Sequence, residues 1–257
     1  MRNFRLIARL DVKGRNVVKG IQLEGLRKMG NPNEYAKKYY RDGIDEILYM
    51  DIVASLYERG NLLDIVRETT RDVFIPITVG GGLRTLDDVT ATLRAGADKI
   101  AINTAAIKRP QIIREISEAF GAQCVVLSIE AKREAGGRWS VYYDNGREKT
   151  GMDVLEWAQQ GCSLGAGEIL LTSVDQEGTA QGFDQELVRT VAAAVSVPVI
   201  ACGGMGNLGH LDELVRRARP DAVAMAHVLH YGKLTVPDIR ASLRSGNVPV
   251  RSVPPCP

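Results

Sequence analysis

The feature that most constrains the fold of this chain is an internal repeat about half as long as the chain itself. RLDVK (Arg9–Lys13) recurs as SIEAK (Ser128–Lys132), and EILYMDI (Glu46–Ile52) recurs as EILLTSV (Glu168–Val174). Two further matching stretches begin at Gly81 and at position 203. A period of roughly 120 residues is far longer than a solenoid unit, so it indicates one half of a domain used twice.

Strand-like and helix-like patterns alternate within each half. Amphipathic stretches such as 33–43 and 85–97 separate short β-branched runs, and Thr85 with Asp88 resembles a helix capping box. Strands that alternate with helices predict a parallel sheet, and four strands used twice close into eight. We therefore predict an α/β fold, a single (βα)8 TIM barrel built from two half-barrel repeats over residues 1–245. The predicted strands are Arg5–Val12, Glu46–Ile52, Ile75–Val79, Lys99–Asn103, Cys124–Ile129, Glu168–Val174, Pro198–Ala201 and Ala222–Ala226.

Composition excludes several classes of function. With 33 basic and 31 acidic residues, the chain gives no electrostatic reason to expect nucleic acid or a membrane surface as partner. It has no apolar run of about 18 residues and no signal-peptide pattern, so we expect a cytoplasmic protein. Four cysteines without a CxxC pair and three histidines without HExxH predict neither a disulfide framework nor a metal site. The proline-rich residues 246–257 are expected to be a flexible tail.

Two acids occupy matching places in the repeat. Asp11 and Glu130 each stand at the end of an alternating apolar run, two residues before Lys13 and Lys132. The loops that follow the strands form the active face of such barrels, so both carboxylates would face one mouth from opposite sides. There they could act as general acid and general base. The alternative is that each acid only caps a turn or pairs with the lysine that follows it.

Glycine-rich loops recur in the two halves as well. TVGGGL (Thr78–Leu83) and ACGGMG (Ala201–Gly206) each follow a predicted strand and precede a helix, and short loops at Asn103–Ala106 and Ala226–Leu229 follow the next strands. Glycine lets backbone N–H groups approach a ligand, and helix N-termini favour anions. The repeat therefore predicts two anion sites on opposite sides of the mouth and a substrate with a phosphate at each end. The alternative is that these glycines only form tight turns.

Taken together, these motifs resemble the cyclase subunit of imidazole glycerol phosphate synthase, over nearly the whole chain to about residue 235. The segments that carry the resemblance are LDVKGRNVVKG, DEILYMDIVAS, TVGGGL, ADKIAINTAA, GAGEILLTS and GTAQGFD. The resemblance implies a (βα)8 enzyme that forms a heterodimer with a glutaminase subunit and needs no cofactor. It implies that ammonia from this partner reacts with a bisphosphorylated aminoimidazole carboxamide nucleotide. The products would be imidazole glycerol phosphate and the carboxamide ribotide used in purine synthesis.

The resemblance also implies roles for individual residues. Asp11 and Glu130 would be the catalytic acids, and Asp98 would contact the glutaminase. A ring of Arg5, Glu46, Lys99 and Glu168 on the barrel floor would gate ammonia. The implied contacts to the substrate and its phosphates are Lys19, Gly82, Asn103, Thr104, Thr172, Glu177, Gly178, Gly203, Gly204, Ala226 and His227.

Five positions depart from the family pattern. Glu130 and Glu177 stand where aspartate is usual, and His227 and Cys202 where serine is common. Arg9 stands where a small residue is usual. Because side chains alternate along a strand, Arg9 shares the inward face with Asp11 and should pair with a buried carboxylate. We expect that partner to be Glu130, which would then be held ionised and would be a poor proton donor.

These departures leave three functions open. The chain is a working cyclase subunit, or a paralogue that delivers ammonia to a different acceptor such as a surface sugar, or a non-catalytic scaffold that activates a glutaminase. The retained acid at position 11, Lys19 and both glycine loops argue against the scaffold.

Overall fold

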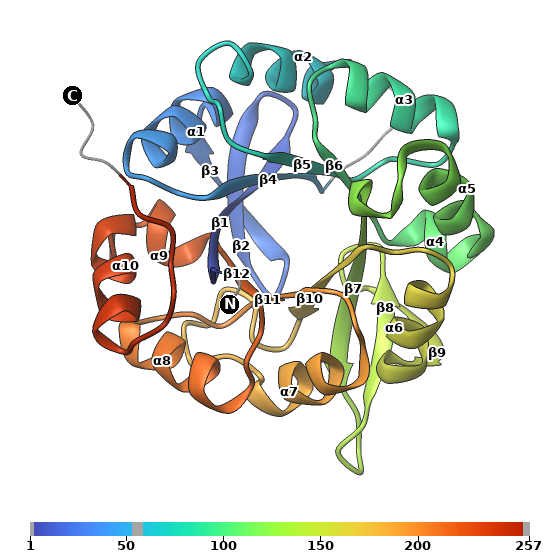
Figure 1. Ribbon diagram of the computed structural model, residues 1–257. Helices are drawn as coiled ribbons and strands as arrows, with labels where there is room; N and C mark the ends of the chain where they lie inside the picture. Colours follow the sequence, from blue (N-terminus) through green and yellow to red (C-terminus); the bar gives the residue numbers. More distant parts are fainter. Residues whose placement is uncertain (1–2, 53–58, 254–257) are drawn as a thin grey trace.

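A computed structural model of the chain describes residues 3–52 and 59–253. In this part, eight parallel strands pair side by side, and the pairing of β10 with β7 closes them into a barrel inside a ring of helices (Figure 1). The predicted single (βα)8 barrel is therefore confirmed. In barrel order the strands are β1 (Arg5–Lys13), β4 (Glu46–Asp51), β5 (Ile77–Gly80), β6 (Lys99–Ile102), β7 (Val125–Arg133), β10 (Glu168–Ser173), β11 (Val199–Cys202) and β12 (Ala222–Met225).

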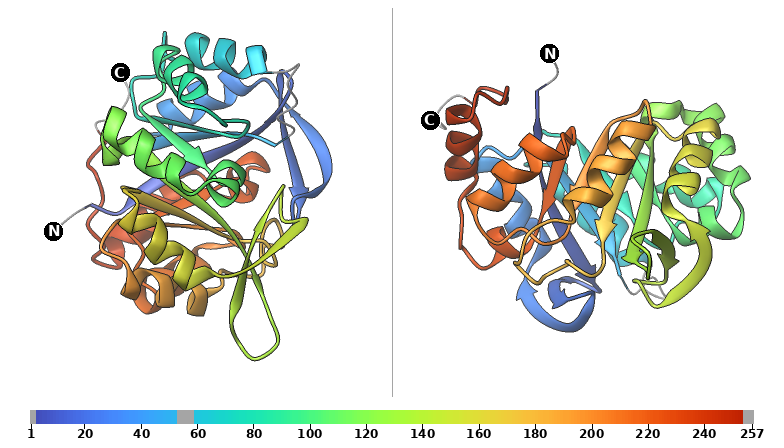
Figure 2. Two further views of the ribbon diagram at one scale, coloured as in Figure 1. Left: turned by 90° about the vertical axis from the view of Figure 1, so that its right-hand side faces the viewer. Right: turned by 90° about the horizontal axis from the view of Figure 1, so that it is seen from below.

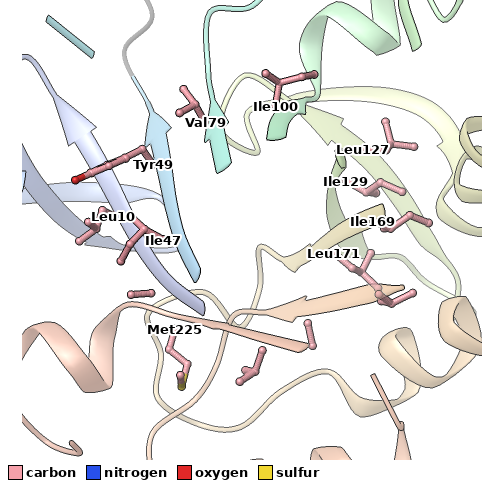
Figure 3. Packing of buried hydrophobic residues seen from close by; sticks show 14 of the residues in the cluster. Leu10, Ile47, Tyr49, Val79, Ile100, Leu127, Ile129, Ile169, Leu171 and Met225 are labelled. Carbon is pink, nitrogen blue, oxygen red and sulfur yellow. The ribbon is translucent and has the colours of Figure 1, made fainter. Parts of the chain in front are cut away.

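Helices cover the outside of the barrel and bury the outward-facing side chains of the strands. This outer layer is the larger apolar core, and Figure 3 shows part of it, including Leu10, Tyr49 and Leu171. Aliphatic side chains at alternate strand positions exclude water from the strand–helix interface, which is the main source of stability in such a fold. The helices are α1 (Pro32–Arg41), α2 (Arg59–Thr69), α3 (Leu86–Arg94), α4 (Thr104–Lys108), α5 (Gln111–Phe120), α6 (Val154–Ser163), α7 (Gln185–Ala194), α8 (Leu208–Arg217), α9 (His227–His230) and α10 (Val236–Ser245), with a 3₁₀ turn at Ala122–Cys124.

The inward-facing positions form a second, smaller apolar layer inside the barrel. Each strand from β1 round to β12, apart from β5, contributes to it, so it lies across the barrel rather than along one side. Above and below this layer the inward positions are charged or polar, as the alternation on β1 predicts. Its members are Ile7, Leu48, Ala101, Val126, Leu170, Ile200, Cys202, Ala222 and Ala224.

The predicted elements agree with the structure except at their ends. Thr85 caps α3, and its hydroxyl and the Asp88 carboxylate make the reciprocal bonds of the predicted capping box. The prediction ended one strand at Ile129, whereas β7 continues to Arg133. That strand is longer because its last residues pair with a hairpin that the sequence analysis did not predict.

Two antiparallel hairpins extend the barrel strands on one face. β2 (Asn16–Ile21) and β3 (Glu24–Gly30) follow β1, and β8 (Trp139–Tyr143) and β9 (Glu148–Asp153) follow β7. Both project from the end of the barrel opposite the N-terminus (Figure 2). Because parallel strands all end on that side, the hairpins flank the mouth that the carboxyl ends of the strands surround.

The C-terminal segment contacts the rest of the domain up to the last described residues. Val250 bridges to Phe4, and Arg251 donates from Nε to Asp45 Oδ1 at 2.8 Å. Its final residues, 254–257, lie outside the described residues, so the flexibility of the tail stays a prediction. Among the residues that are described, no helix is both long and apolar enough to cross a membrane.

Candidate functional site

Both matched acids lie at the mouth of the barrel. Asp11 is the third residue from the end of β1, and Glu130 is the fourth from the end of β7. Their side chains are buried, with 3% of Asp11 and 9% of Glu130 exposed. Since β1 and β7 are related by the internal repeat, the two carboxylates face the interior from opposite halves of the barrel.

Arg9 pairs with Asp11 and not with Glu130, so the predicted partner was wrong. Its Nε donates to Asp11 Oδ1 at 2.8 Å, and its Nη1 lies 3.3 Å from both Thr172 Oγ1 and Cys202 Sγ. Residues two apart on one strand share a face, which brings Arg9 to Asp11 directly. Burial opposes ionisation of Asp11, but the charges of Arg9 and Lys19 outweigh it and lower the pKa of Asp11.

Glu130 is held by a backbone group of the second hairpin. Its Oε2 accepts from the N–H of Gly146 at 2.7 Å, in the turn between β8 and β9. Burial raises the pKa of Glu130, and the bond from Gly146, the more distant Arg9 charge and Asn103 offset this only in part. Glu130 is therefore not paired with Arg9, the contact that was expected to hold it ionised. The two carboxylates have pKa values displaced in opposite directions, the pattern by which one acts as base and the other as acid.

The first hairpin lies over the mouth and is fixed to the loop after β10. Lys19 on β2 and Glu177 in that loop form an ion pair with both side chains buried. The N–H of Gln22 donates to the carbonyl of Glu177 at 2.7 Å, and a Cβ on Gly178 would lie 2.6 Å from the Gly20 carbonyl oxygen. Burial lowers the pKa of Lys19, yet Glu177 and then Asp11 reverse this, so the pKa of Lys19 is raised and it stays cationic.

The two glycine loops have matching backbones at matching places in the repeat. Gly81 and Gly82 after β5 have φ of 94° and 68°, and Gly203 and Gly204 after β11 have φ of 100° and 104°. A Cβ on Gly204 would lie 1.9 Å from the Gly182 carbonyl oxygen, so only glycine fits there. Each loop is followed, one strand later, by a short helix, α4 beginning at Thr104 or α9 beginning at His227 just after Ala226.

Several polar atoms at the mouth are buried without a hydrogen-bond partner in the part of the chain that the structure describes. They are Asn103 Oδ1, Ser173 Oγ, His227 Nε2 and His230 Nε2. Native proteins leave few such groups unpaired, so unpaired groups in both halves of the repeat at the mouth are typical of a ligand site. Burial lowers the pKa of His227, whose ring packs on that of Tyr231 with centroids 4.8 Å apart.

His230 is a buried histidine of this region that sequence reasoning missed. Tyr39 Oη lies 2.7 Å from its Nδ1, and the two rings stack. Burial lowers the pKa of His230 to about 4, with the charge of Asp11 acting in the opposite direction. Gly146 was missed too, although the Asp144-Asn145-Gly146 sequence between two β-rich runs is a strong hairpin signal.

The opposite end of the barrel carries the predicted ring of charges. Arg5 pairs with Glu46 at 2.6 Å and with Glu168, and Lys99 pairs with each of the same two carboxylates at 3.0 Å. This closed set of four side chains, the floor ring, confirms that the four residues lie together. A cavity of about 390 Å³ opens beside it, lined by Asn3, Arg5, Lys99, Gln123, Gly167, Glu168, Pro198 and Asp221.

Asp98, which precedes the floor-ring residue Lys99 in the sequence, accepts a hydrogen bond within the barrel. Its Oδ2 accepts from the N–H of Ile77 at 2.8 Å, and its repeat counterpart Asp221 accepts from the N–H of Val199 at 2.9 Å. Each of the two acids thus caps the start of a neighbouring strand. This bond uses one carboxylate oxygen, so a contact to a partner at Asp98 stays a prediction.

Comparisons with known proteins agree with this geometry. The family model described as histidine biosynthesis protein matches residues 5–235. A protein of Legionella pneumophila named imidazole glycerol phosphate synthase subunit HisF is 65% identical over 208 residues, which cover 81% of this chain and 98% of that protein. A protein of Myxococcus xanthus with the same name is 49% identical over 249 residues, which cover 97% of this chain and 98% of that protein.

Proposed function

From the membership of this chain in the histidine biosynthesis protein family, we propose that it is the cyclase subunit of an imidazole glycerol phosphate synthase that works in the cytoplasm. It uses ammonia, supplied by a glutaminase subunit in a heterodimer, to cleave a bisphosphorylated aminoimidazole carboxamide nucleotide. The products are imidazole glycerol phosphate and the aminoimidazole carboxamide ribotide. Relatives of this name align with nearly their full lengths, which supports the same activity here.

The observation that carries the chemistry is the unlike surroundings of two buried carboxyl groups at one mouth. Asp11 is paired with the Arg9 guanidinium, whereas Glu130 accepts a hydrogen bond from a backbone N–H. Ammonia must lose protons as its nitrogen is incorporated, and the nitrogen that leaves when the substrate is cleaved must gain one. Asp11, whose pKa is lowered, is the base, and Glu130, whose pKa is raised, is the acid. The same pair can serve both steps because it lies inside one barrel mouth and is buried from bulk water.

The two glycine loops account for a substrate with two phosphates. Gly82, Asn103 and Thr104 would bind one phosphate, and Gly203, Gly204 and Ala226 the other, through backbone N–H groups. The positive φ values of the glycines support this role, because they allow a close approach that side chains would block. Lys19, Glu177 and Gly178 would close over the substrate, with Thr172 and His227 lining the same mouth.

The floor ring would control the passage of ammonia from the glutaminase into the barrel. Arg5, Glu46, Lys99 and Glu168 close the end of the barrel opposite the carboxylates, and the cavity beside them gives a partner access to it. Asp98 would lie in the contact surface with that partner.

Turnover with ammonium salt in place of the glutaminase tests the proposal. The purified chain should convert the bisphosphorylated nucleotide to both products, detected by chromatography, and Asp11→Asn should abolish this conversion. A folded wild-type protein that forms neither product from the nucleotide and ammonium would refute the cyclase assignment.

A further inference from the structure

Arg9 is a buried cation in the barrel interior beside the base of the reaction. Only 4% of it is exposed, and its guanidinium contacts three strands, at Asp11 on β1, Thr172 on β10 and Cys202 on β11. A buried guanidinium costs several kcal/mol unless it is paired and hydrogen-bonded. Here a carboxylate on β1, a hydroxyl on β10 and a thiol on β11 all lie within hydrogen-bond distance of the guanidinium, so this buried cation is both paired and hydrogen-bonded.

The side chains that surround Arg9 inside the barrel are short. Thr172 is in register with Cys202, and Cys202 with Ala224, so three adjacent strands present short side chains at this level. Larger aliphatic residues on these strands, the usual filling of such barrels, would compete with the arginine for space and offer it no acceptor. The neighbours therefore match Arg9 both in size and in polarity.

Arg9 belongs to a neutral set of four buried charges that we call the mouth quartet: Arg9, Asp11, Lys19 and Glu177. Arg9 bonds to Asp11, and Lys19 to Glu177, and each cation also lies within the electrostatic reach of the other anion. The neutral His230 faces Asp11 from α9. Cys202, whose pKa burial raises, faces Arg9 from β11.

The second half of the repeat has no counterpart of this cation. In the matched segments RLDVK and SIEAK, the position of Arg9 is taken by Ser128. Glu130 consequently receives its hydrogen bond from the Gly146 N–H and not from a cation. Two carboxylates that the repeat would make equivalent are thus made unequal by one side chain.

We propose that Arg9 is a positioning residue of the cyclase reaction, which keeps Asp11 ionised and fixed in direction so that Asp11 acts as the base and Glu130 as the acid. Arg9 acts through Asp11 and takes no part in proton transfer itself. The inference rests on the proposed function for its catalytic meaning, but the Arg9–Asp11 coupling can be measured without any substrate.

The first measurement is therefore the titration of Asp11 in the whole protein. Aspartate labelled with carbon-13 at the carboxyl group gives a signal for Asp11, identified by its loss in Asp11→Asn. Arg9→Met, which keeps the length and removes the charge, should raise the titration midpoint of that signal by at least about one pH unit, since one ion pair is worth 1–3 units. Arg9→Lys should restore most of the shift. Arg67→Met, on the surface in α2, should leave the midpoint unchanged.

The second measurement is the pH profile of kcat with ammonium salt. Arg9→Met should lower kcat at neutral pH about 10–100-fold, as expected when a catalytic group is misplaced by about 1 Å. It should also move the acidic limb of the profile to higher pH, with a smaller change in KM. Thermal denaturation monitors folding, and Arg9→Lys serves where Arg9→Met does not fold, because it should keep the wild-type limb with reduced kcat.

The two possible failures can be told apart. An Asp11 signal that titrates alike in wild-type protein and folded Arg9→Met would overturn the inference, whether or not the enzyme turns over the nucleotide. An Asp11 midpoint that rises in Arg9→Met while the wild type shows no cyclase activity would uphold the coupling and refute the proposed function.

Discussion

Replacing Glu130 by glutamine, which has no acidic proton, tests the assignment of acid and base most directly. In Glu130→Gln the side chain keeps its length, and its amide oxygen can still accept the bond that the Gly146 N–H makes at 2.7 Å. The free energy of unfolding should therefore change by no more than about 1 kcal/mol, the net value of one hydrogen bond. An amide cannot donate a proton as an acid, so kcat should fall about 10²–10⁴-fold, the usual contribution of a general acid.

Glu130→Asp separates the position of the acid from its chemistry. The shorter side chain withdraws the carboxyl by one methylene and takes it away from Gly146, which is anchored in the turn of the β8–β9 hairpin. A displacement on the order of 1 Å should cost about 10²-fold in kcat. Aspartate at this place should therefore impair this barrel, even though it is the usual residue of the family.

The assay is turnover with ammonium salt across a range of pH. Because the pKa of Glu130 is raised above its ordinary value, wild-type turnover should fall as the pH increases through that raised pKa, and Glu130→Gln should lose this limb. Glu134→Gln is the matched control, since that carboxylate lies in the turn between β7 and β8 and pairs with Lys149 on β9 at 2.7 Å. A Glu130→Gln protein with wild-type turnover and an unchanged basic limb would refute the assignment.

Three further outcomes are expected. Lys99→Met leaves Arg5 as the one cation beside the two carboxylates of the floor ring. Because the ring is partly exposed to solvent, this substitution should lower the free energy of unfolding, measured in urea, by about 1–3 kcal/mol. Gly204→Ala puts a Cβ 1.9 Å from the Gly182 carbonyl oxygen and should raise KM for the nucleotide in steady-state assays; an unchanged KM would argue against a phosphate at this loop. The pKa of His230 is about 4 when folded, below its unfolded value, so stability should decrease as the pH falls from about 6.5 towards 4, by up to about 3 kcal/mol. His230→Gln should flatten that decrease in pH-dependent urea unfolding, and an equally steep decrease would contradict it.

The sequence was sufficient for the barrel because the evidence for it is periodic. Matching segments such as those that begin at Glu46 and Glu168 appear in both halves, and their strands take equivalent places in one closed sheet. The capping box of Thr85 and Asp88 was readable for a similar reason, since it depends on residues only three apart.

The partner of Arg9 was not predictable in the same way. Strand alternation correctly placed Arg9 inside the barrel, but both Asp11 and Glu130 were then plausible acceptors. Which carboxylate Arg9 reaches depends on the Gly146 N–H, which already donates to Glu130. It also depends on how far along the barrel axis each strand places its side chains. The distance from Arg9 to Glu130 arises from tertiary packing and leaves no local pattern in the chain, whereas the spacing of two residues between Arg9 and Asp11 is such a pattern and was given too little weight.

The floor ring and the mouth quartet each contain two cations and two anions, and each is therefore neutral. A lineage that loses one charge from either set by a point mutation keeps an uncompensated charge inside the barrel, at a cost of about 3–5 kcal/mol when the pair is fully buried. That step would consume a large share of the stability of an ordinary domain, which is about 5–15 kcal/mol. Drift at these eight positions should therefore proceed through paired replacements, and Arg9 should be difficult to lose while Asp11 and Glu177 stay buried beside it.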